Sequence, residues 1–243
     1  MVEGLILTIG SGCAPALILT LLITAPLTLQ SALAEGDVIG SNGATGDITG
    51  TPQKNPILTA EGKNVYILWV GNVPDSVKTF FIRSQDGGLT FTNPIQLANK
   101  VMSSPSLSAS RNNVYLVWDD PSQEPYDVYF RSSTDAGTNF RLPVNLSDNV
   151  GFSRSPKIAS YGSNVYVAWF DRTSSNHNEL FLKASNNNGT TFIERVRLSD
   201  NAVDSGIQIS TVENNVYVIW QDLNAETYDI MFAVSNDSGK SFR

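Results

Sequence analysis

The segment Ser84-Gln85-Asp86-Gly87-Gly88-Leu89-Thr90-Phe91 is the first of four copies of one turn motif, and these copies decide the fold. We call the four segments the repeat turns. The other three are residues 133–140 (STDAGTNF), 185–192 (SNNNGTTF) and 235–242 (SNDSGKSF). Their first serines, at 84, 133, 185 and 235, are 49, 52 and 50 residues apart. A period of this size is typical of propellers and arrays, in which each repeat is one supersecondary unit stacked on its neighbours.

A second element keeps the same spacing. It is a run of the form Asn-Val-Tyr-x-x-Trp, rich in β-branched and aromatic residues and nearly continuous in apolar character. Such a run is typical of a central strand that is covered on both faces. The four runs, which hold all four tryptophans of the chain, are residues 64–69, 113–118, 164–169 and 215–220.

Shorter strand candidates flank each central run. They lie upstream at 56–58, 105–107, 156–158 and 207–209, and downstream at 79–83, 126–131, 179–183 and 228–234. A fourth candidate follows three of the repeat turns, at 95–97, 144–146 and 196–198. The chain shows no helical periodicity, which argues against a helical solenoid. The sequence therefore predicts an all-β fold, a β-propeller of four-stranded antiparallel blades. The predicted blades cover approximately residues 51–103, 104–153, 154–203 and 204–243, and the last is incomplete.

The repeat turns have a structural explanation. Their glycines can adopt the positive φ that tight reversals demand, and the Ser and Asp side chains can bond nearby backbone N–H groups. The closing Phe is expected to return to the apolar interior. In the third copy Asn187 replaces Asp, and an amide can accept the same bond without being an acid. We therefore expect the turns to be scaffold. Their predicted structural residues are Ser84, Asp86, Gly88, Phe91, Ser133, Asp135, Gly137, Phe140, Ser185, Asn187, Gly189, Phe192, Ser235, Asp237, Gly239 and Phe242.

The pattern Ser-x-Asp-x-Gly-x-Thr-Phe resembles the Asp box, or BNR repeat, of the sialidase-like β-propeller superfamily. The resemblance implies a propeller of about six blades or more, and hence a chain that is a fragment with about two repeats missing. The alternative is a four-bladed ring closed by a weak strand at 37–39.

The resemblance also raises the question of a sialidase activity. Sialidases hold the substrate carboxylate with three arginines and use a Tyr nucleophile, a Glu partner and an Asp acid/base. The family's active site lies on the rim opposite the Asp boxes, where this sequence places only Arg154 and Arg172. The segment Phe140-Arg141-Leu142-Pro143 matches a family signature, but it overlaps the second repeat turn, so we interpret the match as coincidence. We expect no catalytic residue in this chain.

Acidic residues recur after the tryptophans as Trp-x-Asp, with an acidic partner seven or eight residues on: Asp127, Glu179 and Asp229. One interpretation is a ring of carboxylates for Ca²⁺ or for sugar hydroxyls. The other, which recurrence in three repeats favours, is that each Asp ends its strand with an Asx turn. His177, the sole histidine, is expected in a solvated loop, and no metal site is predicted. The candidate ligand face comprises Asp120, Asp171, Asp222, Arg154 and Arg172.

The N-terminal part of the chain predicts export. Residues 1–34 are almost wholly apolar or small and form a signal peptide or an N-terminal membrane anchor. Residues 14–29 are a candidate apolar core of the signal, and Ala32-Leu33-Ala34 is a candidate cleavage site. Residues 35–50 are a glycine-rich linker, and the only cysteine, Cys13, precedes it. We expect an extracellular or cell-surface protein, attached to a membrane only through the N-terminal segment if that stays uncleaved.

Charge and composition limit the classes of molecule that this protein is expected to bind. The formal net charge of −7 argues against nucleic acid, because phosphate contacts need clustered Lys and Arg. Sequons at Asn145, Asn188 and Asn236 are interpreted as accidents of composition. The favoured function is an exported, non-catalytic binding module for a glycan or a protein, without a cofactor. The alternatives are a sialidase-type exo-glycoside hydrolase with its catalytic residues mostly in missing blades, and a structural repeat protein of the cell envelope.

Overall fold

A computed structural model of the chain describes residues 54–73, 76–98, 102–122, 124–172, 178–203, 206–224 and 227–243. All of them belong to one compact unit, Val38–Arg243. The expected signal or anchor segment, the linker at 35–50, the weak strand at 37–39 and His177 lie outside the described residues.

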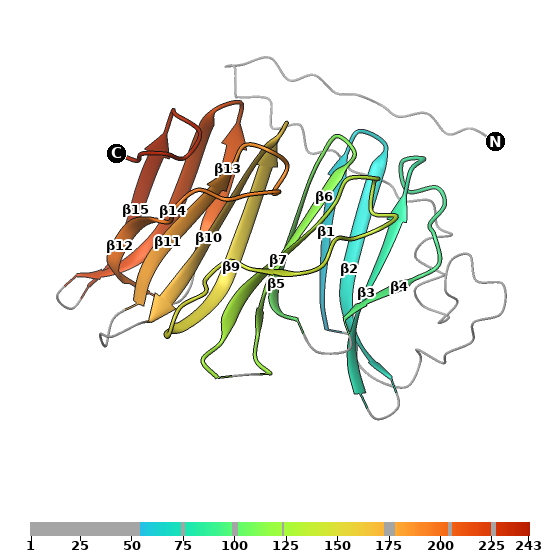
Figure 1. Cartoon of the computed structure of the whole chain (residues 1–243), viewed down its shortest axis with the longest axis horizontal. Helices are drawn as coiled ribbons and strands as arrows, with labels where there is room; N and C mark the ends of the chain where they lie inside the picture. The colour runs from blue at the N-terminus through green and yellow to red at the C-terminus, as the bar shows by residue number, and fades with distance from the viewer. Residues whose placement is uncertain are drawn as a thin grey trace, which may run out of the picture. The chain divides into compact units, whose positions relative to one another are not determined.

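The described residues form antiparallel β-sheets that follow one another in chain order (Figure 1). The first sheet has the order β1-β2-β3-β4, the second β5-β6-β7-β8, and the third β9-β10-β11-β12, followed by β13-β14-β15. The prediction of four-stranded antiparallel sheets is confirmed. The strands are β1 (Lys54–Glu61), β2 (Asn64–Val73), β3 (Ser76–Ser84), β4 (Ile95–Ala98), β5 (Ser103–Ser110), β6 (Asn113–Asp120), β7 (Asp127–Ser133), β8 (Val144–Asn145), β9 (Phe152–Tyr161), β10 (Asn164–Arg172), β11 (Asn178–Ser185), β12 (Val196–Ala202), β13 (Gln208–Val212), β14 (Asn215–Asn224) and β15 (Thr227–Ser235).

The strands of the third repeat, β9–β12, and those of the fourth repeat, β13–β15, do not form separate sheets, which the sequence did not predict. β12 extends to Ala202, four residues beyond the predicted strand, and there it pairs with Asp222 of β14. The N–H of Val203 also donates to the Gln221 carbonyl, at 2.8 Å. The two repeats therefore share one seven-stranded sheet.

Each repeat turn lies beside the turn between the first and second strands of its own sheet. In all four repeats an N–H of the repeat turn donates to a carbonyl of that first turn, at 2.7–3.0 Å. The pairs are Gly87 with Lys63, Ala136 with Asn112, Asn188 with Ser163, and Ser238 with Asn214. These contacts place the repeat turns on one rim of the sheets and the strand ends after the tryptophans on the opposite rim.

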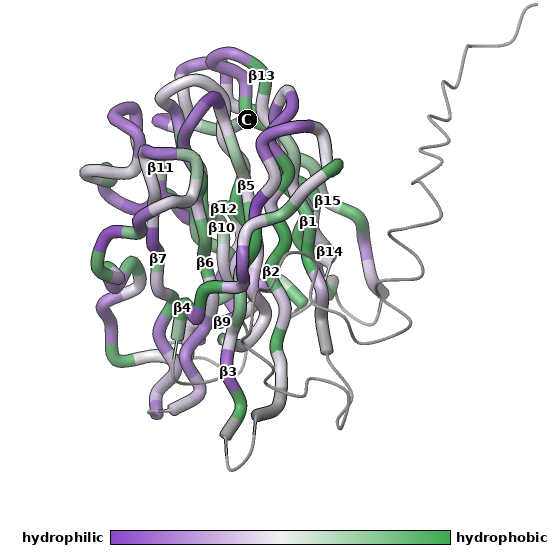
Figure 2. The backbone as a smooth tube through the Cα atoms, turned by 90° about the vertical axis from the view of Figure 1, so that its right-hand side faces the viewer, coloured by the Kyte–Doolittle hydropathy of each residue, from purple (hydrophilic) through white to green (hydrophobic). Residues whose placement is uncertain are grey.

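The apolar cores lie between consecutive sheets. Each central strand uses both faces: in β6, Leu116 and Trp118 pack with residues of the first sheet, whereas Tyr115 and Val117 pack with residues of the third. The hydropathy colouring of Figure 2 shows green, apolar stretches within the strands and many purple, polar stretches in the turns. This double coverage explains why the Asn-Val-Tyr-x-x-Trp runs are almost continuously apolar.

Basic side chains fasten the fourth strand of one sheet to the third strand of the next. Arg131 and Lys183 each lie two residues before a repeat turn. Arg131 donates to the Leu97 carbonyl at 2.8 Å, and Lys183 donates to the Leu146 carbonyl at 2.8 Å. Burial lowers the pKa of both side chains. The corresponding residue of the fourth repeat is Ala233, which has no such donor. There the pairing of β12 with β14 joins the two sheets instead.

Within each repeat turn, one serine and one acid or amide hold the reversal. The Ser133 hydroxyl accepts the N–H of Gly137 at 2.9 Å and donates to Asp135 Oδ1 at 2.7 Å. The same Oδ1 accepts the N–H of Asn139 at 2.9 Å. Asn187 makes the equivalent contacts with Ser185 at 2.8 Å and with the N–H of Thr191 at 3.0 Å. An amide thus builds the same turn as a carboxylate.

These hydrogen bonds make the turns sensitive to acid. A hydrogen bond from the Ser84 side chain is the main cause that holds the pKa of Asp86 well below its usual range, and the Ser241 side chain does the same for Asp237. A hydrogen bond from the N–H of Asn139 is the main cause that lowers the pKa of Asp135 to about 2. A depressed folded-state pKa stabilises the protein above the unfolded-state pKa, about 3.9, and this contribution is lost as the pH falls toward the folded-state value. We expect the midpoint of urea unfolding to fall as the pH drops below about 4.

The matched variant for this prediction is Asp86→Asn. Because Asn187 shows that an amide fits the turn, the variant should fold at neutral pH and lose less stability on acidification than the native chain. An acid dependence identical to that of the native chain would contradict the assignment to the turn carboxylates.

A second prediction concerns Ala136, which adopts a left-handed φ of 56° in the second repeat turn. Its counterpart Asn188, at φ 59°, accepts a hydrogen bond from the Tyr115 hydroxyl at 3.4 Å. The Tyr66 hydroxyl, which occupies the place of Tyr115 one repeat earlier, is buried without a hydrogen-bond partner. Asparagine tolerates the left-handed region better than alanine and would offer Tyr66 an acceptor. Ala136→Asn is expected to raise the free energy of unfolding by about 1 kcal/mol in urea titrations, and the gain should shrink in a Tyr66→Phe background.

Candidate functional site

The recurring acids lie within strands, not in the loops where the sequence placed them. Asp120 ends β6, and Asp171 and Asp222 lie inside β10 and β14. Each is directly opposite its acidic partner across the hairpin: Asp120 faces Asp127, Asp171 faces Glu179, and Asp222 faces Asp229. Asp120 accepts the N–H of Ser122 at 2.9 Å, which is the expected Asx turn. The other two acids have different roles.

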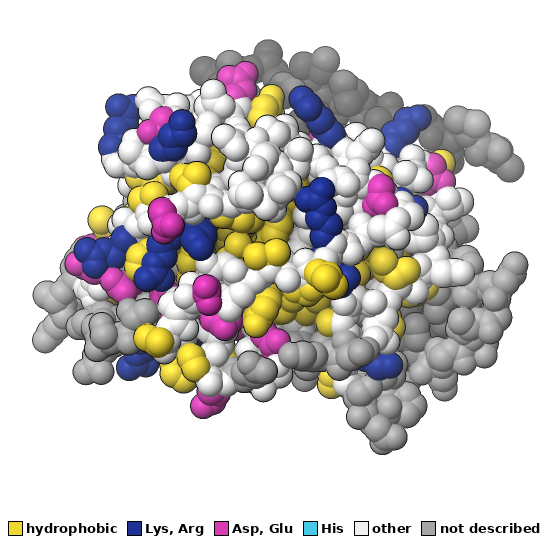
Figure 3. All heavy atoms as spheres, viewed as in Figure 1, with side chains coloured by type: hydrophobic (Ala, Val, Ile, Leu, Met, Phe, Trp, Pro, Cys, Tyr) yellow, Lys and Arg dark blue, Asp and Glu magenta, His cyan; other side chains and the backbone are white. Residues whose placement is uncertain are grey.

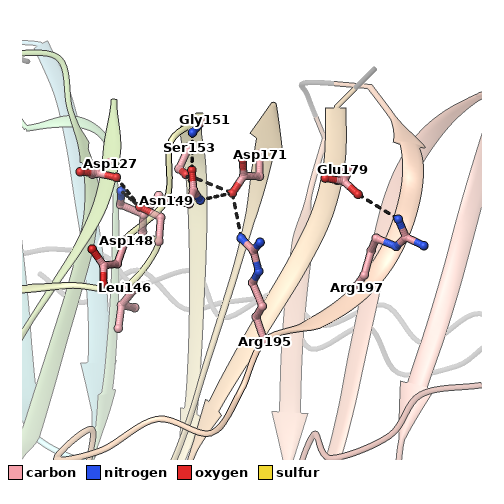
Figure 4. Close-up of polar contacts among 12 residues, drawn as sticks. Asp127, Leu146, Asp148, Asn149, Gly151, Ser153, Asp171, Glu179, Arg195 and Arg197 are labelled. Atoms are coloured by element: carbon pink, nitrogen blue, oxygen red, sulfur yellow. Dashed lines mark hydrogen bonds and ion pairs between the residues drawn. The ribbon is translucent and has the colours of Figure 1, made fainter. Parts of the chain in front are cut away.

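Asp171 is fully buried and is the centre of a polar cluster (Figure 4). Its Oδ2 accepts a short hydrogen bond from Asn149 and another from the Ser153 hydroxyl at 3.3 Å. The Arg195 guanidinium donates to the same oxygen at 3.2 Å and lies 4.2 Å from the ring centroid of Phe181. Burial raises the pKa of Asp171, and Arg195 counteracts this. The cluster fastens the connection between the second and third sheets to β10.

Asp222 also bonds within the protein. Its Oδ1 accepts the Ser199 hydroxyl and the Trp220 indole N–H, both at 2.7 Å. Its exposed fraction is 8%. Asp171 and Asp222 therefore have little surface to offer a ligand. Of the three acids, Asp120 is the one whose side chain is partly exposed.

The two candidate arginines lie at the same end of the third sheet. Arg154 is on β9 and donates to Asn178 Oδ1 at 3.4 Å, and Arg172 is the exposed last residue of β10. Both are on the rim opposite the repeat turns. Among the described residues no group of three or more His, Cys, Asp and Glu side chains is placed to hold a metal ion.

The structure shows a pocket that the sequence did not predict. It has a volume of about 480 Å³ and lies where the inner strands of the first three sheets meet the segment leading into β13. Three serine hydroxyls and one ammonium group are among its polar lining, and its apolar lining comes from four different strands or strand ends. The lining residues are Ile57, Ser103, Ser104, Pro105, Ser155, Lys157, Phe170, Gly206 and Ile207.

Irregular backbone shapes this pocket. Ser104 and Ser155 have φ of 45° and 54°, and the strand register shifts at both places. The N–H of Ser155 donates to Asp119 Oδ1 at 3.1 Å, and Asp119 is only 2% exposed. Bulges of this kind change the direction of side chains next to functional sites. The sequence signal was present, because both serines precede a proline at the start of an inner strand.

The space-filling view of Figure 3 shows one face of the molecule, on which apolar side chains gather in a band across the middle. Basic and acidic side chains are mixed around this band, and neither sign covers an extended area of the face. Within the described ranges the structure contains no helix long and apolar enough to span a membrane.

Comparisons with known proteins identify the fold. No protein-family model matches the chain, and no curated protein matches it. A mutant Trypanosoma rangeli sialidase with trans-sialidase activity matches 85% of this chain with a TM-score of 0.58 and 14% identity. Trypanosoma rangeli sialidase in complex with 2,3-difluorosialic acid matches 78% of it with a TM-score of 0.55 and 12% identity. A Hadza microbial sialidase also matches 78% of it, with a TM-score of 0.55 and 13% identity.

The chain covers 39%, 37% and 45% of these three sialidases, respectively, so it spans less than half of their length. At such identity the likeness concerns the fold alone. The sheets are those of a sialidase-like β-propeller, as the resemblance of the repeat turns predicted.

Proposed function

We propose that the chain is a non-catalytic binding module and that its ligand is a glycan held in the pocket of the inner strands. The observation that carries the proposal is the position and lining of this pocket, on the rim opposite the repeat turns. A volume of about 480 Å³ is in the range of small-molecule sites. The apolar residues 1–34 support export, which would bring the module into contact with extracellular or surface glycans.

The pocket lining suits a polyhydroxylated ligand. Serine hydroxyls both donate and accept hydrogen bonds, so Ser103, Ser104 and Ser155 can pair with sugar hydroxyls in either sense. Lys157 adds a flexible donor. Ile57 and Ile207 provide apolar walls for the C–H surfaces of a sugar ring. The volume and the polar lining of the pocket favour a small ligand unit over a flat protein surface.

The test is binding to a glycan array, followed by titration of the best ligand. Lys157→Glu is expected to weaken binding by about tenfold or more, because it places a carboxylate in the pocket. Lys63→Glu makes the same charge change on an exposed turn of the repeat-turn rim and is expected to leave the affinity unchanged. Equal loss of affinity in both variants would contradict the pocket as the binding site. No binding to any glycan would favour the structural repeat protein of the cell envelope.

A second candidate is a sialidase-type glycoside hydrolase, favoured by the match to the fold of a sialidase solved in complex with sialic acid. Arg154 and Arg172 are the two arginines that the sequence analysis assigned to the rim opposite the repeat turns, where a sialidase would bind its substrate carboxylate. An assay with a fluorogenic sialoside distinguishes the two candidate functions. Hydrolysis by the purified chain would favour the glycoside hydrolase and contradict the non-catalytic binding module.

A further inference from the structure

The residue directly after each tryptophan differs from repeat to repeat, whereas the acid one position further recurs in three repeats. The residues in this place are Val70, Asp119, Phe170 and Gln221. A residue that the shared scaffold requires tends to recur in each repeat, so the scaffold alone does not set this place. Two of its occupants adjoin the pocket. Phe170 lines it, and Gln221 packs against the lining residue Gly206, with its Cγ 3.7 Å from the ideal Cβ position of that glycine.

Asp119 is the one acid among these four residues, and it is buried. Its exposed fraction is 2%, and the same place in the two neighbouring sheets holds Val70 and Phe170, which are 8% and 1% exposed. The fold therefore accepts an apolar side chain in this place. A buried carboxylate is costly unless it is hydrogen-bonded, and a residue that departs from the local pattern at such a cost is expected at a functional site.

The hydrogen bond that Asp119 makes crosses from one sheet to the next. Its Oδ1 accepts the N–H of Ser155 at 3.1 Å, and Ser155 has a left-handed φ of 54°. A residue with a Cβ is disfavoured in this region, so the surrounding structure has to hold it there. Ser104, the other pocket serine with a left-handed φ, has Val70 in the corresponding place of the preceding sheet, and valine offers no side-chain acceptor.

The bulge at Ser155 decides which way the neighbouring cations point. Arg154, on one side of the bulge, is opposite Phe170. Lys157, on the other side, is opposite Ala168. Opposite residues of antiparallel strands have their side chains on the same face, and Ala168 and Phe170, two residues apart, share one face of β10. Arg154 and Lys157 therefore both lie on the face of the pocket-lining Phe170, although residues three apart on a regular strand lie on opposite faces.

We propose that Asp119 is the positioning residue of the pocket: it holds the bulge at Ser155 and thereby directs Lys157 toward the bound glycan. The inference rests on the proposed function, because it assigns a role toward the ligand of that same pocket. Asp119 is not a lining residue and acts through the backbone of the next sheet. A side chain without an acceptor in this place loosens the bulge, and one that keeps the acceptor preserves it.

The experiment compares Asp119→Val with Asp119→Asn in the full chain. Valine occupies this place in the first repeat and has no acceptor, whereas the asparagine Oδ1 can still accept the Ser155 N–H. Asp119→Val should weaken binding of the best array glycan by about tenfold or more, and Asp119→Asn should bind within about twofold of the native chain. Gly62→Ala, in a turn of the repeat-turn rim, controls for lost stability alone and should keep the native affinity.

A double variant tests whether Asp119 acts through Lys157. Both substitutions disturb one arrangement, so their effects on the affinity should not add. Asp119→Val/Lys157→Glu is expected to bind the glycan no more weakly than Lys157→Glu alone. Independent effects that multiply in the double variant would overturn the inference, because Asp119 would then influence the ligand by another route.

Hydrogen exchange at the Ser155 N–H, followed by NMR, needs no ligand. Exchange should become about tenfold faster or more in Asp119→Val and stay near the native rate in Asp119→Asn. Unchanged exchange in Asp119→Val overturns the proposal. Faster exchange with native glycan affinity also overturns it, since Asp119 would then have a purely structural role. If the native chain binds no glycan, the proposed function fails, and the exchange rates alone decide whether Asp119 holds the bulge.

Discussion

Gly189→Ala is expected to lower the free energy of unfolding by about 4 kcal/mol, because it combines two unfavourable effects. Gly189 has a φ of 71°, which disfavours any residue with a Cβ. The new Cβ would also overlap the buried ring of Phe130, whose Cε1 lies 2.8 Å from its ideal position. Phe130 is 1% exposed and stacked on Tyr115, so a shift of its ring would disturb packed neighbours. Urea or thermal unfolding measures the loss.

Gly62→Ala is the matched control. Gly62 has a φ of 60°, but a Cβ there would meet nothing within 4 Å, so the expected loss is about 1 kcal/mol from the backbone alone. In a Phe130→Leu background the Gly189→Ala loss should shrink, because Leu182 occupies the equivalent place in the third sheet. Equal losses at Gly62 and Gly189 would show that contact with the preceding sheet does not constrain the repeat turn.

Arg195→Met is expected to destabilise the protein by about 3 kcal/mol near neutral pH, because it leaves the fully buried Asp171 carboxylate without its cation. Methionine retains much of the packing on Phe181, so the loss reports mainly on the charge. The double variant Asp171→Asn/Arg195→Met should recover part of the stability, since it removes the uncompensated charge as well.

The pH dependence gives this variant a signature of its own. Burial raises the pKa of Asp171 in the folded protein, and Arg195 lowers it. Removing Arg195 raises it further. An acid whose pKa is higher when folded binds more protons in the folded state, so stability falls as the pH rises from the unfolded-state pKa through the folded-state one. The variant should therefore regain stability relative to the native chain in urea titrations as the pH falls from neutral toward the unfolded-state pKa, about 3.9. A constant difference across this range would contradict the role of Asp171.

Much of the fold was predictable because it depends on local, repeated chemistry. The Asn-Val-Tyr-x-x-Trp runs and the Ser, Asp and Gly positions of the repeat turns indicated strands and reversals that the structure shows. The ends of strands were not predictable from the same signals. β14 continues through Gln221 and Asp222, whose polar character indicated a loop, because Ser199 and the Trp220 indole satisfy the carboxylate inside the structure.

The site was less predictable, because its residues meet only in three dimensions. The sequence assigned Arg154 and Arg172 to the rim opposite the repeat turns from the order of the strands alone. The burial of Asp171 depends on Asn149 and Arg195, which come from other segments of the chain. The pocket depends on bulges at Ser104 and Ser155 and on five segments spread over 150 residues, from Ile57 to Ile207. Proline at the start of the inner strands was the one local sign of it.

The pairing of β12 with β14 has a consequence for how the molecule comes apart. Sheets whose strands do not pair can separate without breaking a backbone ladder: among the described residues, the second and third are linked by a single backbone hydrogen bond, from the N–H of Ser153 to the Tyr126 carbonyl. The third and fourth sheets instead pair strands, at Ala202 and Asp222, with a further backbone bond from Val203 to Gln221. Cooperative opening follows continuous ladders and packed cores more than it follows sequence periodicity. We therefore expect the last two repeats to open as one cooperative unit, although the sequence repeats them as two.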